Sequence, residues 1–221
     1  MSNYCCTDIT INATTKEQQE GLRVINNILE SADKFTTDRY KRRWLGSLAE
    51  AFGIGKEKDR FVYDEEGTYI QCRGTLGSYE LTEDDDFSQL SIQIDDENGS
   101  HLNIWKRVRD KFAAGAELIY CANCEGDENL YTNDPTIAGL YMIDIWDNTS
   151  KTEAGKKLDN DSYYELTEDK AIKMLNDYFG TSYKTIKPLQ KLADESECLE
   201  LKAYEFDDTD EELNALNDLA A

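Results

Sequence analysis

The sequence predicts an α+β protein with a mainly antiparallel sheet and helices on one face of it. Strand-like and helix-like segments interleave along the 221 residues, and several short strands adjoin one another as hairpins. Hydrophobic residues make up 39% and aromatic residues 10%, which suffices for a core. A doubly wound parallel sheet is the alternative, but no expected strand leads into a Gly-rich phosphate loop.

The first fifty residues predict a strand followed by two helices. Residues 4–12 read as a strand, because Ile9 and Ile11 share one of its faces. Thr14 and Glu17 match a capping box, so we expect a helix that reaches about Ser31. A second helix is expected over 38–52, where aromatic and aliphatic residues recur four apart.

The rest of the chain alternates in the same way. Leu90, Ile92 and Ile94 alternate with polar residues, as in a half-buried strand. Strands are expected over 60–63, 69–76, 89–95, 116–121, 137–146 and 198–206, helices over 102–113, 167–179, 183–194 (interrupted at Pro188) and 209–219, and loops over 83–86 and 123–136.

The order β-α-α-β-β-β-α-β-β over residues 1–146 suits a decorated ferredoxin-like unit. We therefore expect a ferredoxin-like domain over 1–150. A C-terminal α/β extension over 151–221, acidic and packed on that domain, completes the expected organisation.

Acidic residues dominate the charge. The chain has 24 Lys and Arg against 46 Asp and Glu, a formal net charge of −22. This excludes an ordinary nucleic-acid binder, which needs a basic surface, and no apolar run is long enough to span a membrane. The segments 51–100 and 151–221 each carry a net charge of −9. The candidate partner-binding residues are the acidic runs of the first segment: Asp64, Glu65, Glu66, Glu83, Asp84, Asp85, Asp86, Asp95, Asp96 and Glu97.

The cysteines and the histidine indicate no chemistry. The N-terminus lacks the features of a signal peptide, so we expect a cytoplasmic protein with reduced thiols. Cys121 and Cys124 form a C-x-x-C pair, read as two ordinary thiols at a strand end; a zinc site completed by Cys5, Cys6 or Cys72 is the alternative. His101 is the single histidine. We predict no catalytic residue, no metal and no cofactor.

The segment Asn3-Tyr4-Cys5-Cys6-Thr7-Asp8-Ile9-Thr10-Ile11 resembles the opening strand of the YubB-like ferredoxin domains. The later segments 105–112, 118–121, 125–128 and 139–146 are similar to the family's helix, strand, acidic stretch and Gly-Leu-Tyr strand, although a Pro-containing Trp segment is missing. The resemblance covers roughly residues 3–146. It implies a ferredoxin-like fold and a plasmid or phage origin, and it carries no catalytic residue.

Three functions remain open from the sequence. The first is an acidic inhibitor, not an enzyme, that occupies a basic nucleic-acid-binding groove of a host defence complex such as a CRISPR effector, without binding nucleic acid or a membrane itself. The second is a cytoplasmic regulatory or structural binding module unrelated to nucleic acid. The third is an unrecognised enzyme. Basic clusters such as Lys56, Lys58 and Arg60 read as solvated faces, or alternatively as contacts with the acidic blocks in a homo-oligomer.

Overall fold

The computed structural model describes residues 4–32, 44–58, 61–97 and 102–207. These residues form two compact units, one ending at Gly126 and the other spanning Asp127–Asp207. From the sequence we placed the boundary at residue 150. The residues between 127 and 150 instead share their contacts with the C-terminal part of the chain.

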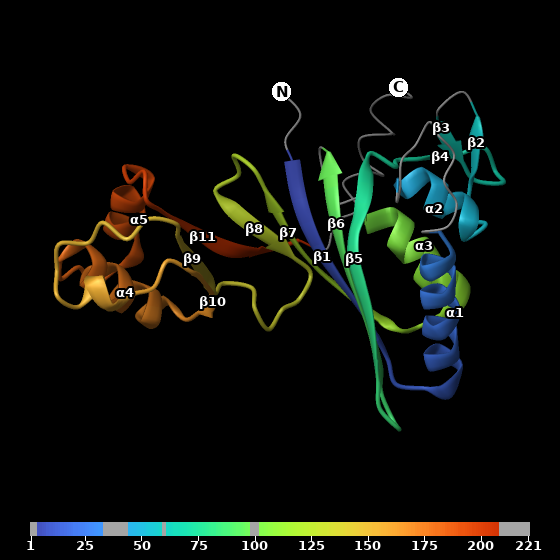
Figure 1. Ribbon diagram of the computed structural model, residues 1–221, viewed down its shortest axis with the longest axis horizontal. Helices are drawn as coiled ribbons and strands as arrows, with labels where there is room; N and C mark the ends of the chain where they lie inside the picture. The colour runs from blue at the N-terminus through green and yellow to red at the C-terminus, as the bar shows by residue number, and fades with distance from the viewer. Residues whose placement is uncertain (1–3, 33–43, 59–60, 98–101, 208–221) are drawn as a thin grey trace. The chain divides into compact units, whose positions relative to one another are not determined.

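The first unit is built on four strands. They lie in the order β7-β1-β6-β5, and every neighbouring pair is antiparallel. Helices α1 and α3 lie against one face of this sheet (Figure 1). The elements are β1 (Tyr4–Ala13), α1 (Lys16–Ala32), β5 (Gly74–Glu83), β6 (Ser88–Glu97), α3 (Leu102–Phe112) and β7 (Glu117–Cys124). The expected α+β fold with a mainly antiparallel sheet is confirmed.

Alternation along β1 separates the two faces of the sheet. Ile9 and Ile11 are buried toward the helices, as their spacing predicted, and their partners on β6 are Ile92 and Leu90. Trp105 of α3 is fully buried in the same core. Side chains at alternate strand positions point to opposite faces, so the polar residues between them lie on the face away from the helices.

The capping box of helix α1 lies one residue later in the chain than the sequence predicted. The side-chain oxygen of Gln18 accepts hydrogen bonds from the backbone N–H groups of Thr14 and Thr15, at 3.1 and 3.2 Å. The N–H of Gln18 in turn donates to Oγ1 of Thr15 at 3.3 Å. The reciprocal pair is therefore Thr15 with Gln18, and the expected pair of Thr14 with Glu17 is wrong.

A small antiparallel sheet is inserted between α1 and β5. Its strands lie in the order β2-β3-β4, and β2 was not predicted. The expected strand over 69–76 splits into β4 and the start of β5, and β5 then continues to Glu83, into the expected loop. The expected helix over 38–52 is described only from α2 onward, since residues 38–43 lie outside the described residues. The elements are α2 (Leu45–Ala51), β2 (Lys56–Lys58), β3 (Phe61–Tyr63) and β4 (Tyr69–Ile70).

The second unit holds four strands in the order β10-β9-β11-β8. Strand β9 is antiparallel to both neighbours, whereas β11 and β8 are parallel. Strand β8 lies in the expected loop 123–136, β10 was not predicted, and β9 is shorter than expected. The elements are β8 (Asn129–Thr132), β9 (Tyr141–Ile145), the 3-10 turn η1 (Gly155–Lys157), β10 (Ser162–Leu166), α4 (Glu168–Phe179), α5 (Ile186–Asp194) and β11 (Leu199–Phe206). The helix expected over 209–219 lies outside the described residues.

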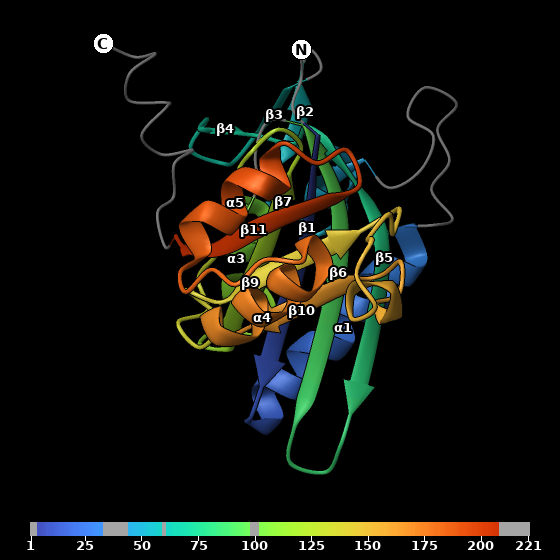
Figure 2. The same ribbon diagram turned by 90° about the vertical axis from the view of Figure 1, so that its left-hand side faces the viewer.

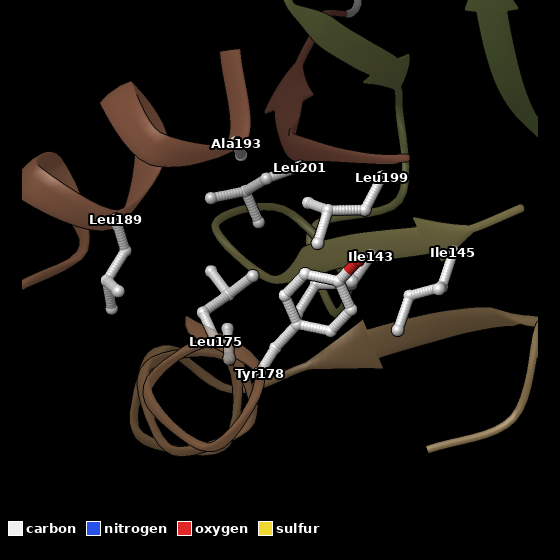
Figure 3. Packing of buried hydrophobic residues seen from close by; sticks show 9 residues of the cluster. Ile143, Ile145, Leu175, Tyr178, Leu189, Ala193, Leu199 and Leu201 are labelled. Carbon is white, nitrogen blue, oxygen red and sulfur yellow. The ribbon is translucent and has the colours of Figure 1, made fainter. Parts of the chain in front are cut away.

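The second unit has its own hydrophobic core, between its sheet and the helices α4 and α5 (Figure 2). Figure 3 shows Leu175 and Tyr178 of α4 packed against Ile143, with Leu201 and Leu189 close by. Helix α5 is not interrupted at Pro188, because this residue lies in the first turn, where backbone N–H groups have no partner within the helix.

The close approach of α1 and α3 in the first unit depends on Gly21. A Cβ added to Gly21 would overlap the carbonyl oxygen of Phe112. We expect Gly21→Ala to lower the free energy of unfolding by about 1–3 kcal/mol, because the two helices would have to separate. Urea denaturation measures this loss. Asn27→Ala, at an exposed position of α1, is the control and should change the free energy of unfolding by less than about 0.5 kcal/mol. Equal losses at both positions would contradict the close contact of the helices.

Candidate functional site

The ten acidic residues singled out in the sequence fall into three groups. Asp64, Glu65 and Glu66 lie in the turn between β3 and β4. Glu83 ends β5, and Asp84–Asp86 form the turn that leads into β6. The third group, Asp95–Glu97, ends β6. Asp95 is exposed, and the side chains of Asp96 and Glu97 are outside the described part of the structure.

The hairpin of β5 and β6 separates the second acidic group from the other two. The β5–β6 turn lies at one end of the first unit, and the C-terminal end of β6 and the small sheet lie at the other (Figure 1). The nine residue steps from Asp86 to Asp95 run mostly along β6 and span roughly 30 Å. The structure therefore does not gather the ten acids into one cluster.

Asp64 is a structural residue of its turn. Its carboxylate accepts hydrogen bonds from the Thr68 N–H at 2.7 Å and from Nη1 of Arg107 at 2.9 Å. Only 8% of its side chain is exposed. Burial by itself would raise the pKa of Asp64, but the bonds from Thr68 and Arg107 outweigh burial and hold the pKa below its ordinary value. Asp64 thus joins the turn to α3 and is poorly placed to meet a partner.

Glu65 and Glu66 are exposed in the same turn. Glu65 borders a cleft of about 410 Å³ that α2 and the small sheet also line through Glu50, Lys56 and Tyr63. The backbone N–H of Glu57 donates to the Glu50 carboxylate at 2.7 Å. The cleft therefore has three carboxylates, from Glu50, Asp64 and Glu65, and one ammonium group at its walls, an excess of negative charge.

The β5–β6 turn is the most acidic projection of the first unit. We call Asp84, Asp85, Asp86 and Phe87 the hairpin tip. The Asp84 N–H donates to the Phe87 carbonyl at 2.7 Å, which closes the turn. All three aspartates are exposed, and no hydrogen bond or ion pair with another described residue engages their carboxylates.

Arg23 of α1 supports the base of the hairpin tip. Its Nε donates to Glu83 at 2.6 Å and its Nη1 donates to Glu20 at 2.9 Å. Glu83 is thereby partly neutralised, in contrast to the three aspartates beyond it. A shallow groove of about 640 Å³ runs between Arg23 and the tip.

The polar face of the first sheet carries an acidic residue that the sequence analysis missed. Asp8 lies on β1 directly opposite Gln93 of β6 and Cys121 of β7. Burial raises the pKa of Asp8, and a hydrogen bond from Gln93 partly offsets this effect. The alternation of Ile9 and Ile11 with polar residues was the signal that places Asp8 on this face.

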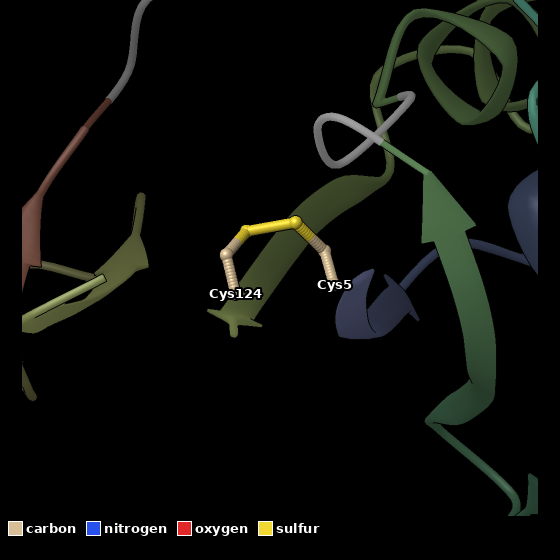
Figure 4. Close-up of a disulfide and its surroundings, with 2 residues drawn as sticks. All are labelled: Cys5 and Cys124. Atoms are coloured by element: carbon tan, nitrogen blue, oxygen red, sulfur yellow. A yellow bond between two sulfur atoms is a disulfide. The ribbon is translucent and has the colours of Figure 1, made fainter. Parts of the chain in front are cut away.

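The cysteines do not behave as expected. Cys5 and Cys124 are opposite one another on β1 and β7 and form a disulfide (Figure 4). The expectation that they are reduced thiols is therefore wrong. They lie at the two ends of the first unit's sequence, 119 residues apart, so only the pairing of the first and last strands brings them together.

The C-x-x-C pair is not a chelating pair. Both cysteines lie within strand β7, and positions three apart on a strand point to opposite faces. Cys124 is buried on the helix side, whereas Cys121 lies on the polar face. Within the described ranges, no three His, Cys, Asp or Glu residues come together that could hold a metal ion. His101 lies outside these ranges.

No family model, no curated protein and no solved structure matches the chain. The resemblance to the YubB-like ferredoxin domains therefore stays a prediction. Among the described helices, none has the length and apolar character needed to cross a membrane.

The ion pair of Asp64 makes stability depend on pH. Because the pKa of Asp64 is lowered in the folded state, its stabilisation is complete above the unfolded pKa of about 3.9 and is lost as the pH falls through the folded pKa. We expect Asp64→Asn to cost about 1–2 kcal/mol at pH 7, and the gap to the parent protein to close on acidification. Urea denaturation across pH measures this gap. Glu65→Gln is the isosteric control in the same turn; a gap that stays constant with pH would contradict the role assigned to Asp64.

The disulfide predicts the number of free thiols. Alkylation of the denatured, unreduced protein should modify four cysteines, whereas prior reduction should expose all six. Cys5→Ser combined with Cys124→Ser should lower the free energy of unfolding by about 2–5 kcal/mol, because the disulfide closes a long loop. Cys6→Ser, on the opposite face, should have little effect. Six free thiols in protein purified from an oxidising compartment would refute the disulfide.

Proposed function

We propose that the protein is an acidic inhibitor that binds the basic nucleic-acid-binding surface of a host defence complex, in the manner of an anti-CRISPR protein. The observation that carries the proposal is the hairpin tip, whose three exposed aspartates are engaged by no other described residue. Carboxylates that no other described residue engages are available to an arginine- or lysine-lined groove. Glu65 and Asp95 are exposed carboxylates at the other end of the unit, separate from the hairpin tip.

The topology of the first unit supports a ferredoxin-like fold for it. If α2 and the small sheet are set aside, its elements follow in the order β1-α1-β5-β6-α3-β7. The sheet order β7-β1-β6-β5 with antiparallel neighbours is the split βαβ arrangement. We propose that the unit is a ferredoxin-like domain with an insertion between α1 and β5, the fold that the resemblance to the YubB-like ferredoxin domains implies.

The polar face of this sheet favours a protein partner over nucleic acid. RNA-binding domains with a four-stranded sheet stack bases on aromatic residues of that sheet. Here the central strands present Asp8, Thr10, Ser91 and Gln93 instead. A face with a carboxylate and no ring at these positions offers bases nothing to stack on and repels phosphates. The proposed inhibitor therefore acts on the protein component of the host defence complex.

A second function follows from the spread of the charge. Residues 1–126 carry a net charge of −8 and residues 127–207 a net charge of −9, so acidity is not confined to one unit. An even acidic coat keeps a protein soluble without marking one partner. This observation favours a regulatory or structural binding module unrelated to nucleic acid, and the test below separates the two.

The test is retention of bacterial proteins by the immobilised chain. We expect nucleic-acid-binding proteins to be retained at low salt. High salt should release them because it screens the contact charges, and an added oligonucleotide should release them because it competes with the immobilised chain for the same basic groove. Replacement of Asp84, Asp85 and Asp86 by Asn should abolish retention.

The matched control removes three exposed charges from the second unit, through Asp194→Asn, Glu195→Gln and Glu197→Gln. This variant should retain the same proteins as the parent. Retention that ignores oligonucleotide, or that both variants weaken equally, would contradict mimicry and favour the binding module. Mass spectrometry identifies the retained proteins.

A further inference from the structure

The outer face of the small sheet combines three aromatic rings with two lysines. The β2–β3 register sets Lys56 opposite Tyr63 and Lys58 opposite Phe61, and the β3–β4 register sets Tyr63 opposite Tyr69. Residues directly opposite on neighbouring strands share a face. We call these five residues the ring face.

The rings of the ring face are partly accessible: Phe61 is exposed, whereas Tyr63 and Tyr69 are half-buried. Phe61 is 48% exposed, and its ring centroid lies 5.8 Å from that of Tyr69, which lies 6.1 Å from that of Tyr63. Val62 and Ile70 alternate with these rings and are buried on the other side of the small sheet. The rings therefore lie outside the core beneath, and clustered aromatic rings that stay partly accessible are typical of contact surfaces.

The hairpin tip is chemically complementary to the ring face. The hairpin tip offers three carboxylates and the aromatic ring of Phe87. The ring face offers two exposed ammonium groups and three rings. Both surfaces belong to the first unit and lie at its opposite ends (Figure 1). The tip of one molecule can thus meet the ring face of another, whereas the tip of the same molecule cannot reach its own.

We propose that the protein associates head to tail, the hairpin tip of one copy docking on the ring face of the next. Two different surfaces at opposite ends give a heterologous contact, which extends into open chains and does not stop at a closed dimer. The proposal goes beyond the inhibitor function and does not rest on it. It does imply that a partner bound at the hairpin tip competes with self-association.

Charge sets the conditions under which this association occurs. Copies with a net charge of −22 repel one another at low salt. At an ionic strength of about 0.15 M the Debye length is about 8 Å, so the overall repulsion is screened while pairs in contact still attract. At about 1 M salt the contact pairs are screened as well. Association is therefore expected to be strongest at intermediate salt.

Sedimentation equilibrium of the purified full chain tests the proposal. At about 0.15 M salt the weight-average mass should rise with concentration, and it should return to the monomer value at about 1 M. Lys56→Gln with Lys58→Gln should weaken association about tenfold or more, as should Asn at all three aspartates of the tip. Phe61→Ala should weaken it through the loss of ring contact.

Mixing the two variants is the decisive step. The lysine variant keeps an intact hairpin tip and the tip variant keeps an intact ring face, so the mixture should form dimers that cannot extend, although neither variant associates by itself. Lys184→Gln with Lys187→Gln removes the same charge from exposed positions of the second unit and should associate like the parent. Circular dichroism that matches the parent shows that each variant is folded.

Other results would overturn the proposal. A monomer at every concentration and salt would do so, and so would variants that associate as the parent does. If the ring-face variants lose binding of a fluorescein-labelled oligothymidylate of about ten nucleotides and leave the mass unchanged, the ring face binds single-stranded nucleic acid instead.

Discussion

The pairing of β1 with β6 on one side and β7 on the other is the constraint on which the first unit depends. This register makes β1 a central strand, and its two-residue alternation then decides what each face carries. Ile9 and Ile11 go to the helix side with Cys5, and Asp8 goes to the polar side. A shift of one residue would bury Asp8 and expose the isoleucines. The same register sets Cys5 opposite Cys124, so the disulfide is a consequence of the strand order and not of any motif in the sequence.

The hairpin of β5 and β6 decides how the charge is distributed. It is long enough to carry one acidic run to each end of the unit, and side-chain contacts then give the runs different roles. Asp64 pairs with Arg107 and Glu83 pairs with Arg23, while no such partner engages the aspartates of the hairpin tip among the described residues. The number of acidic residues therefore says little about how much charge a partner meets. The contacts of each carboxylate determine whether it supports the fold or remains available.

The two proposed activities use the same surface in different ways. A hairpin tip that docks on a basic groove of a partner and a hairpin tip that docks on the ring face of another copy compete for the same three aspartates. Self-association would then keep the acidic surface covered until a partner with more positive charge displaces the neighbouring copy. The ring face is available for docking because Val62 and Ile70, on the opposite face of the small sheet, are the residues that are buried.

The sequence by itself determined the α+β class, the main helices and the half-buried strands around Ile9 and Ile92, because these depend on local periodicity and capping. It missed β2, β8 and β10, which are short or bordered by polar residues and exist through pairing with distant strands. It also placed the unit boundary at 150 instead of 126 and read Cys5 and Cys124 as thiols. The acidic runs were visible in the sequence, but their separation, the internal use of Asp64, and the shared face of Lys56, Lys58 and Phe61 were decided by tertiary structure. Each depends on which strands become neighbours, and the pattern of polar and apolar residues along one strand does not specify the strands with which it pairs.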